Sequence, residues 1–326
     1  MKKQFLLSLI LTLFCGIIYG QHLIRVNNDV NADADYTTLQ EANDNASNGD
    51  TIYLEGSITN YEGVVLSKKL TIIGPGYFLS ENDSTQANGL EAYTSSLDFD
   101  AGSAGSIITG IKVSTVYIRV NDIIIKRCKA DYIYNYGDIN NILILQNYVG
   151  YIGSYTGIIT NGIISNNIVT SQIYLGSNSG PLQITNNVIL ALYSTPISVY
   201  NSSIANNIIA SSYDINENTG NTITNNILSC TGTNANGNQY NIVMTNVFVD
   251  YNDTYGYSTD GKWKLKKGSP AIGAGVSGVD CGVFGGVTPY VLSGLPALPH
   301  IYEAAIAGTA YSDQGLSCTI KIKSGK

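Results

Sequence analysis

The stretch "ISNNIV", residues 164–169, decides the fold because it returns three times downstream with the same design. It recurs as "ITNNVI" from residue 184, "IANNII" from residue 204 and "ITNNIL" from residue 223. Paired asparagines flanked by aliphatic residues therefore repeat with a nearly constant period. Such a repeat, of about 20 residues, predicts a unit that buries its apolar side only by stacking on copies of itself.

Two rows of asparagine keep this period through the chain. The first row, a predicted structural ladder, contains Asn147, Asn167, Asn187, Asn207, Asn226 and Asn246. The second row contains Asn121, Asn141, Asn161, Asn201, Asn221 and Asn241. Two rows in phase argue against a chance repeat and predict that one asparagine of each pair lies at a sharp bend. Stacked amides are then expected to hydrogen-bond along the row.

The segments between the asparagine pairs predict an all-β fold. They are short, rich in β-branched residues, and separated by glycine and asparagine turns without a helical pattern, as in "GIIT" at 157–160 and "SQIYLG" at 171–176. Three such strands per coil are typical of a parallel β-helix, which is a β-solenoid with about 20 residues per coil. The aliphatic residues of each phrase are expected to stack inside the coils.

Composition supports this fold class and excludes several functions. Charged residues make up only 13% of the chain, and Tyr numbers 24 against Phe 6. The net charge of −7 argues against nucleic acid as a partner. The cysteines Cys128, Cys230, Cys281 and Cys318 form no CxxC or Cys/His spacing, which argues against a structural zinc site.

The N-terminal segment 1–20 predicts a signal peptide. Lys2 and Lys3 precede an apolar run that ends at Tyr19, and the small Gly20 suits cleavage before Gln21. No later run reaches the roughly 20 apolar residues of a membrane span, so no transmembrane segment is expected. We therefore expect a secreted or cell-surface location in a bacterium.

The remaining chain divides into a solenoid and a tail. Residues 21–288 are assigned to the solenoid, with 21–57 as an N-terminal cap that includes one short helix begun by Thr38 and Glu41 in capping-box spacing. Residues 289–326 are assigned to an extended tail that ends in a strand within 315–326. This strand is expected either to pack on the last coil or to pair with an exposed edge of its own domain or of a partner.

Two parts of the chain resemble a known family. "TLQEANDNASNGDTIYLEGS" (38–57) with "KKLTIIGPG" (68–76) is similar to the opening of secreted bacterial right-handed parallel β-helix proteins of the pectate-lyase-like superfamily. "GSPAIGAG" (268–275) and "DCGVFGG" (280–286) resemble the closing coil of many members. The resemblance covers roughly residues 22–290 and implies a right-handed β-helix. Cys281 departs from the usual aliphatic residue, and a Cys281–Cys318 disulfide is one consequence to consider.

The resemblance also implies two chemistries. Lyases of the superfamily use Ca²⁺ held by carboxylates and a basic Arg or Lys, and its hydrolases use clustered aspartates. Residues 139–213 contain no charge at all, so an active site would lie in the earlier coils. The period of the asparagine rows, extended to these coils, places Lys112 over Asp131 and Arg119 over Asp138. Such pairs favour neutralising contacts, and Arg119, Asp131 and Asp138 remain the alternative catalytic set.

A second acidic phrase, "DVNADAD" at 29–35, has oxygen-bearing residues at alternate positions. Asp29, Asp33 and Asp35 are therefore weak candidates for Ca²⁺. The sharp-turn glycine and the final glutamate of a calcium loop are missing. We expect no cofactor, with Ca²⁺ as the only alternative.

Tyrosines provide the remaining candidate site. They recur about once per coil as Tyr134, Tyr155, Tyr174, Tyr193 and Tyr213, and Tyr132 with Tyr151 forms a second pair. Tyr174 lies between two aliphatic residues, so strand alternation is expected to point it outward, although an inward structural stack is the alternative. Outward rings would form a strip that stacks on sugars.

The leading hypothesis is a secreted, non-catalytic surface or matrix module that binds glycan or a cell-envelope partner along one solenoid face. The alternative is a polysaccharide lyase or glycoside hydrolase with a site in the coils around residues 98–138.

Overall fold

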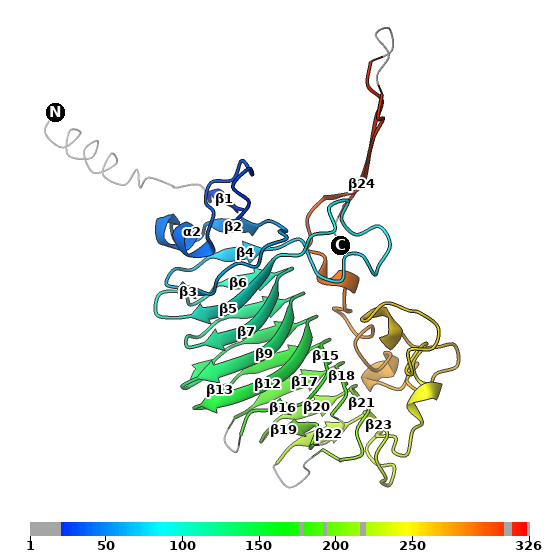
Figure 1. Cartoon of the computed structure of the whole chain (residues 1–326). Coiled ribbons are helices and arrows are strands. Elements are labelled where there is room, and N and C mark those ends of the chain that lie inside the picture. Colours follow the sequence, from blue (N-terminus) through cyan, green and yellow to red (C-terminus); the bar gives the residue numbers. More distant parts are fainter. Residues whose placement is uncertain (1–20, 177–178, 192–193, 216–219, 310–314, 325–326) are drawn as a thin grey trace, which may run out of the picture.

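The chain forms a parallel β-solenoid of about 8 turns (Figure 1). The computed structural model describes residues 21–176, 179–191, 194–215, 220–309 and 315–324. The predicted signal peptide lies outside these residues. The predicted all-β solenoid with about 20 residues per turn is confirmed.

Two long parallel sheets and one short one make the walls of the coils. The first sheet has ten strands, in order β1 (Leu23–Val26), β2 (Thr51–Leu54), β4 (Thr71–Ile73), β6 (Ile107–Thr109), β8 (Ile124–Lys126), β11 (Leu143–Leu145), β14 (Gly162–Ser165), β17 (Leu182–Thr185), β20 (Ser203–Ala205) and β22 (Thr222–Thr224). The second has β3 (Val64–Leu66), β5 (Tyr93–Phe99), β7 (Lys112–Ile118), β9 (Lys129–Tyr136), β12 (Tyr148–Thr156), β15 (Ile168–Val169), β18 (Val188–Ile189), β21 (Ile208–Ile209) and β23 (Ile227–Leu228), joined by β16 (Ile173–Tyr174) and β19 (Ile197–Ser198). The short sheet pairs β10 (Ile139–Asn140) with β13 (Ile159–Thr160).

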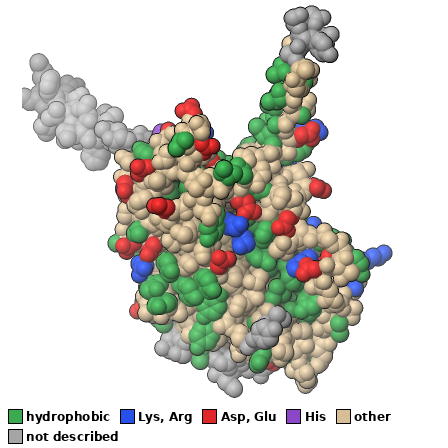
Figure 2. All heavy atoms as spheres, viewed as in Figure 1, with side chains coloured by type: hydrophobic (Ala, Val, Ile, Leu, Met, Phe, Trp, Pro, Cys, Tyr) green, Lys and Arg blue, Asp and Glu red, His purple; other side chains and the backbone are tan. Residues whose placement is uncertain are grey.

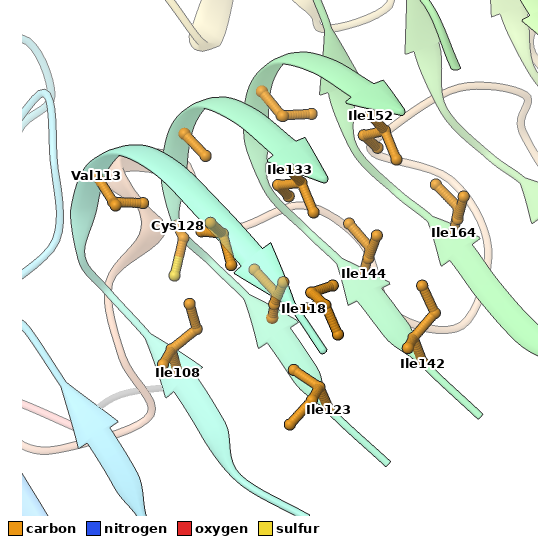
Figure 3. Packing of buried hydrophobic residues seen from close by; sticks show 14 of the residues in the cluster. Ile108, Val113, Ile118, Ile123, Cys128, Ile133, Ile142, Ile144, Ile152 and Ile164 are labelled. Atoms are coloured by element: carbon orange, nitrogen blue, oxygen red, sulfur yellow. The ribbon is translucent and has the colours of Figure 1, made fainter. Parts of the chain in front are cut away.

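Aliphatic side chains stack along the inside of these sheets. Ile108, Ile125 and Ile144 hold equivalent register positions on β6, β8 and β11, and each is fully buried. Figure 3 shows side chains of this set, Ile108 and Ile144, in one continuous core with Ile133 and Ile152 of the second sheet. Each coil therefore buries its apolar residues between its own walls and against its neighbours, as expected for parallel strands.

A short helix covers the N-terminal end. Helix α2 (Leu39–Asn45) begins at Thr38, whose hydroxyl accepts the Glu41 N–H and lies 3.0 Å from the Glu41 carboxylate. This is the predicted capping box. Leu39 is buried in the core, and Gln40 Oε1 accepts the N–H of Val65 on the edge strand β3. The helix thus protects an edge that would otherwise expose unpaired backbone.

The second asparagine of each repeated phrase is buried at the corner between the two long sheets. Each side-chain Nδ2 in this row donates to the Oδ1 of the next asparagine in the row, at 2.9 to 3.0 Å. The row consists of Asn147, Asn167, Asn187, Asn207, Asn226 and Asn238. Each of these accepting Oδ1 atoms also accepts the backbone N–H of the previous asparagine in the row, which lies one coil earlier. Cys128 occupies the equivalent corner position before Asn147 and donates its backbone N–H to Asn147 Oδ1.

The placement of Asn246 in this row was wrong. Asn238 takes the position after Asn226, and Asn246 lies exposed in the 3-10 helix η1 (Met244–Asn246). The chain leaves the coils after β23, so the residues that follow no longer keep the period of the repeat.

The first residue of each corner has a different conformation. The row consists of Arg127, Gln146, Asn166, Asn186, Asn206 and Asn225, and all six have φ between 52° and 59°. This left-handed backbone turns the chain between the sheets, and asparagine tolerates it better than most residues. The side chains of the row point away from the core toward a later part of the chain.

That later part is the strap, residues 274–295. It runs along the outside of the corner, from the C-terminal coils back toward the N-terminal end (Figure 1). At its ends Asn225 Nδ2 donates to Ala274 O, and Arg127 Nη1 donates to Leu295 O, both at 2.9 Å. Between them Asn166 Nδ2 donates to Gly285 O at 2.8 Å.

The sequence interpretation assigned residues 21–288 to the solenoid and residues 268–286 to a closing coil. In the structure β23 is the last strand of the coils, and these later residues approach or form the strap. The chain between β23 and the C-terminal tail strand contains the 3-10 helices η1, η2 (Gly261–Trp263), η3 (Val276–Gly278) and η4 (Leu292–Gly294). Its apolar residues pack on the outer corner to form a second core around Phe248 and Trp263.

The tail forms a hairpin that projects beyond the N-terminal end of the solenoid (Figure 1). Strands β24 (His300–Ile306) and β25 (Cys318–Lys323) are antiparallel. The predicted terminal strand therefore pairs with β24. Cys281, buried in the strap, and the exposed Cys318 of β25 are both free thiols, which excludes the considered disulfide.

Candidate functional site

Six tyrosines gather on the outer surface of three neighbouring strands. This tyrosine patch consists of Tyr117 on β7, Tyr132, Tyr134 and Tyr136 on β9, and Tyr151 and Tyr155 on β12. On β9 the tyrosines alternate with the buried Ile133 and Asn135, so the pleat points them outward. Figure 2 shows green side chains, a class that includes tyrosine, gathered over the middle coils.

The rings contact one another both along β9 and across to β12. Tyr136 stacks on Tyr155 with ring centroids 4.6 Å apart, and Tyr132 stacks on Tyr134 at 5.6 Å. Tyr134 also meets the edge of Tyr155 at 6.1 Å and lies 5.6 Å from Tyr151. The side chains of Tyr132 and Tyr155 remain 45% and 65% exposed. The patch is therefore a continuous aromatic surface with free ring faces.

A glycine makes room for one of these rings. Gly153 pairs with Tyr134 on one side and with Tyr174 on the other. A Cβ at Gly153 would lie 2.0 Å from a ring carbon of Tyr151, so the Tyr151 ring covers the position where a side chain would stand. The glycine lets the Tyr151 ring lie over Gly153, where it contacts Tyr134 of the preceding coil and Gln172 of the next.

Tyr134 and Tyr151 of the patch have raised pKa values. Burial of the phenol, followed by the neighbouring tyrosines, raises the pKa of Tyr134. Burial also raises the pKa of Tyr151, although a hydrogen bond with Gln172 acts in the opposite direction. These hydroxyls therefore remain donors as well as acceptors at neutral pH.

An ion pair borders the patch. Arg119 lies over the ring of Tyr136, with its guanidinium carbon 4.4 Å from the centroid. Its Nε and Nη2 donate to the two carboxylate oxygens of Asp98, each at 2.8 Å. This bidentate pair neutralises the arginine and holds it flat against the aromatic surface.

The predicted tyrosine strip is only partly assembled. Tyr134 and Tyr155 belong to the patch, and Tyr174 shares their face, 47% exposed, one strand beyond Gly153. Tyr213 lies in the loop after β21, and Tyr193 is outside the described residues. Tyr155 is not in register with Tyr134, because the register partner of Tyr134 on β12 is Gly153.

Sequence periodicity missed Tyr117 and Tyr136. The signal that would have found them is alternation within one strand, since "DYIYNYGD" at 131–138 places a tyrosine at every second position. A search at the coil period relates residues about 20 positions apart, so it does not detect tyrosines that lie two positions apart on one strand.

The predicted ion pairs of the early coils were wrong. Lys112 pairs in register with Lys129 and not with Asp131, because this coil is shorter than those that carry the asparagine rows. The Lys112 ammonium instead binds Glu91 at 2.8 Å. The shorter coil likewise brings Arg119 to Tyr136 and not to Asp138, and Arg119 forms its ion pair with Asp98 on β5 of the preceding coil.

The alternative catalytic carboxylates make local contacts. Asp131 lies 3.5 Å from the Lys129 ammonium, and Asp138 Oδ1 accepts the N–H of Ile158 at 3.2 Å. Within the described ranges no group of three His, Cys, Asp or Glu side chains is placed to hold a metal ion.

The weak Ca²⁺ candidates also bond locally. Asp29 Oδ1 accepts the N–H of Asn31, and Asp35 Oδ2 accepts the N–H of Arg25 at 2.7 Å. Asp33 contributes its backbone oxygen to the Arg25 guanidinium. These contacts fasten the lead-in segment to strand β1.

Comparison of the chain with protein-family models, curated proteins and solved structures finds no match in any of the three. In the part of the chain that the structure describes, no helix is both long enough and apolar enough to cross a membrane.

Proposed function

We propose that the chain is a secreted, non-catalytic module that binds a neutral polysaccharide through the tyrosine patch. The observation that carries this proposal is the exposed, continuous aromatic surface on β7, β9 and β12. Tyrosine rings stack on the apolar faces of sugar rings, and their hydroxyls exchange hydrogen bonds with sugar hydroxyls. Strands of a solenoid hold such rings in place before the ligand arrives, which lowers the entropic cost of binding.

Polar groups around the rings suit a ligand rich in hydroxyls. Thr115 on β7 is the register partner of Tyr132 on β9 and shares its face of the sheet. Gln172 adds an amide next to Tyr151. These groups donate and accept, as sugar hydroxyls do, and they supply the directional contacts that apolar stacking lacks.

The charges near the patch favour a neutral ligand over an acidic one. Arg119 is already neutralised by Asp98. Asp131 and Asp138, near the two ends of β9, are exposed. Asp131 lies beside the Lys129 ammonium, so a polymer with carboxylate or sulfate groups would meet repulsion chiefly from Asp138.

We propose that the module is non-catalytic because Arg119 and Asp138, two of the alternative catalytic residues, already bind other groups of the protein. Arg119 is bound by both oxygens of Asp98, and Asp138 accepts a backbone N–H. The proposed secretion and surface location rest on residues 1–20 and agree with a polysaccharide ligand. Membership of the pectate-lyase-like superfamily, implied by the resemblance, is also part of the proposal and does not by itself require cleavage.

The patch predicts a defined effect of removing two rings. Residues 21–326 are expected to bind a neutral polysaccharide in a panel that contains neutral and acidic polymers. Replacing Tyr134 and Tyr155 together by alanine is expected to weaken this binding roughly 10- to 30-fold, since each stacking contact contributes about 1 kcal/mol. Affinity is measured by titration calorimetry with soluble oligosaccharides or by co-sedimentation with insoluble polymers.

Tyr213→Ala is the matched control, because Tyr213 is 49% exposed on a loop outside the patch. Its binding should equal that of the parent protein. Undiminished binding by the double variant would place the site elsewhere, and a preference for acidic polymers would overturn the neutral ligand. Release of shortened chains that is lost in Arg119→Ala would replace the binding module by an enzyme.

A further inference from the structure

The segment between β23 and the strap contains a pocket that the tyrosine patch does not use. Its volume is about 600 Å³, and it is lined by Val249, Tyr255, Gly256, Tyr257, Lys266 and Lys267. One aliphatic residue, two aromatic rings and two cations therefore face the same space. The pocket differs in charge from the tyrosine patch, whose arginine is neutralised by Asp98.

A buried carboxylate shapes the aromatic wall of the pocket. Asp250 Oδ1 accepts the N–H of Thr254 at 2.6 Å, and Asp250 Oδ2 accepts the N–H of Tyr255 at 2.9 Å. The same Oδ2 also accepts the N–H of Tyr257 at 3.4 Å. Between the two tyrosines, Gly256 has a φ of 75°, which closes the turn. The backbone that carries both rings is thus fixed before a ligand arrives, and this lowers the entropic cost of binding.

Both rings are available to a ligand. Tyr255 is 75% exposed and Tyr257 50%. Val249, the aliphatic residue of the lining, is half-buried. Exposed aromatic faces beside an aliphatic surface suit a ligand that has a ring with an apolar face.

The two lysines have no carboxylate partner. Lys266 donates its ammonium to a backbone carbonyl at 2.8 Å, and Lys267 forms no ion pair among the described residues. The acidic residues nearby in sequence are engaged, since Asp253 binds Lys262 at 2.7 Å and Asp250 binds the turn. Two positive charges are therefore left uncompensated at the pocket, in a chain whose net charge is −7. Such a local charge attracts anions within about 10 Å.

We propose that this pocket binds an anionic sugar, that is, a sugar unit with a carboxylate or a phosphate group. The sugar ring packs on Tyr255 and Tyr257, and the ammonium groups of Lys266 and Lys267 bind the anion. A lysine ammonium is a compact charge with three donors, so it serves carboxylate and phosphate alike. The volume falls within the usual range of small-ligand sites, about 300–1,000 Å³.

Both halves of the pocket enter this choice of ligand. A site for a bare anion would not need two exposed rings, and a site for a neutral sugar would not need two uncompensated cations. The proposal does not depend on the tyrosine patch, because the patch lies on β7, β9 and β12 and shares no residue with this pocket.

Binding of small ligands to residues 21–326 tests the site. Glucuronate, glucose 6-phosphate, glucose and inorganic phosphate are titrated separately, and affinities are measured by ligand-observed NMR. We expect each anionic sugar to bind at least about 5-fold more tightly than glucose, because two contacts between opposite charges are added. This advantage should shrink as salt is raised. The better of the two anionic sugars then shows whether the site takes a carboxylate or a phosphate.

Variants locate the binding in the pocket. Lys266→Ala with Lys267→Ala is expected to lower the affinity for both anionic sugars to that for glucose. Tyr255→Ala should weaken the binding of glucuronate and leave that of inorganic phosphate unchanged. Lys126→Ala is the matched control, because Lys126 also lacks an ion pair among the described residues and lies on β8, away from the pocket.

Equal affinities for glucose and glucuronate overturn the proposal, as does unchanged binding by the double lysine variant. Inorganic phosphate that binds as tightly as glucose 6-phosphate would show that the rings take no part and would replace the sugar site by a simple anion site. Unchanged circular dichroism verifies that the variants fold. Lys267→Ala alone removes no ion pair among the described residues and is expected to weaken glucuronate binding roughly 2- to 3-fold, so the test does not rest on the double variant.

Discussion

The two asparagines of "ISNNIV" perform different tasks at adjacent positions. Asn166 has a φ of 56°, turns the chain, and donates its amide to the strap. Asn167 is fully buried and bonds to its neighbours in the coils before and after it. Asparagine serves both tasks because its short amide tolerates the left-handed conformation and offers donor and acceptor together.

Asn187→Ala is expected to be strongly destabilising. Asn187 Oδ1 accepts both the backbone and the side-chain N–H of Asn167, and its Nδ2 donates to Ile164 O at 2.9 Å. Alanine would leave these buried groups without partners, at about 1–3 kcal/mol each. We expect the free energy of unfolding to fall by about 3–5 kcal/mol in urea titrations. Asn140→Ala, at an exposed position, should change it by less than about 0.5 kcal/mol; similar values for both variants would contradict the role of the buried row.

At the scale of elements, the strap and the corner row form one unit. The strap offers backbone carbonyls to side chains that extend from a series of left-handed residues, so contact with the solenoid depends on a tightly folded strap that lies close to these side chains. Glycine permits this tight folding. At Gly285 a Cβ would lie 2.0 Å from Asp280 O and 3.2 Å from Asn186 Nδ2.

Gly285→Ala is expected to loosen the strap. The added methyl cannot fit without moving backbone, and such overpacking costs about 1–3 kcal/mol. We expect a corresponding loss in the free energy of unfolding and faster proteolysis within residues 274–295. Gly89→Ala is the matched control, because a Cβ there meets no atom within 4 Å. Equal stability and equal cleavage of the two variants would show that the strap does not depend on this contact.

At the scale of the whole molecule, the strap connects distant coils. Solenoid repeats contact only their neighbours and can unfold piecemeal. Here the strap bonds to coils from Arg127 to Asn225. In addition, the buried hydroxyls of Tyr77 and Tyr290 meet at 2.7 Å, which ties the N-terminal part to the strap. These contacts are expected to make unfolding cooperative.

Two probes test this cooperativity. The single tryptophan, Trp263, is buried in the outer core against Phe248, and its fluorescence reports that core. Far-ultraviolet circular dichroism reports the strands of the solenoid. We expect both signals to give one urea midpoint in the parent protein and separate midpoints in Gly285→Ala, with Trp263 changing first. Two midpoints in the parent protein would show that the strap and the coils unfold independently.

The candidate site illustrates what one sequence can and cannot predict. Alternation of Ile173, Tyr174 and Leu175 was sufficient to point Tyr174 outward, because side-chain direction in a strand has a period of two. The neighbours of each ring were not predictable. They depend on the short coil between Lys112 and Lys129 and on the register shift after Ser154, and neither follows from the average period.

By itself the sequence determined the features that repeat: the length of the coil, the aliphatic interior, the asparagine corners and the capping helix. These features follow from the local conformational preferences of the residues and from a spacing that recurs in successive coils. Only the tertiary structure decided the course of the strap, the replacement of Asn246 by Asn238, and the gathering of six tyrosines. The reason is physical, since these features rest on single contacts between residues far apart in the chain, and no period records which distant backbone a corner side chain will meet.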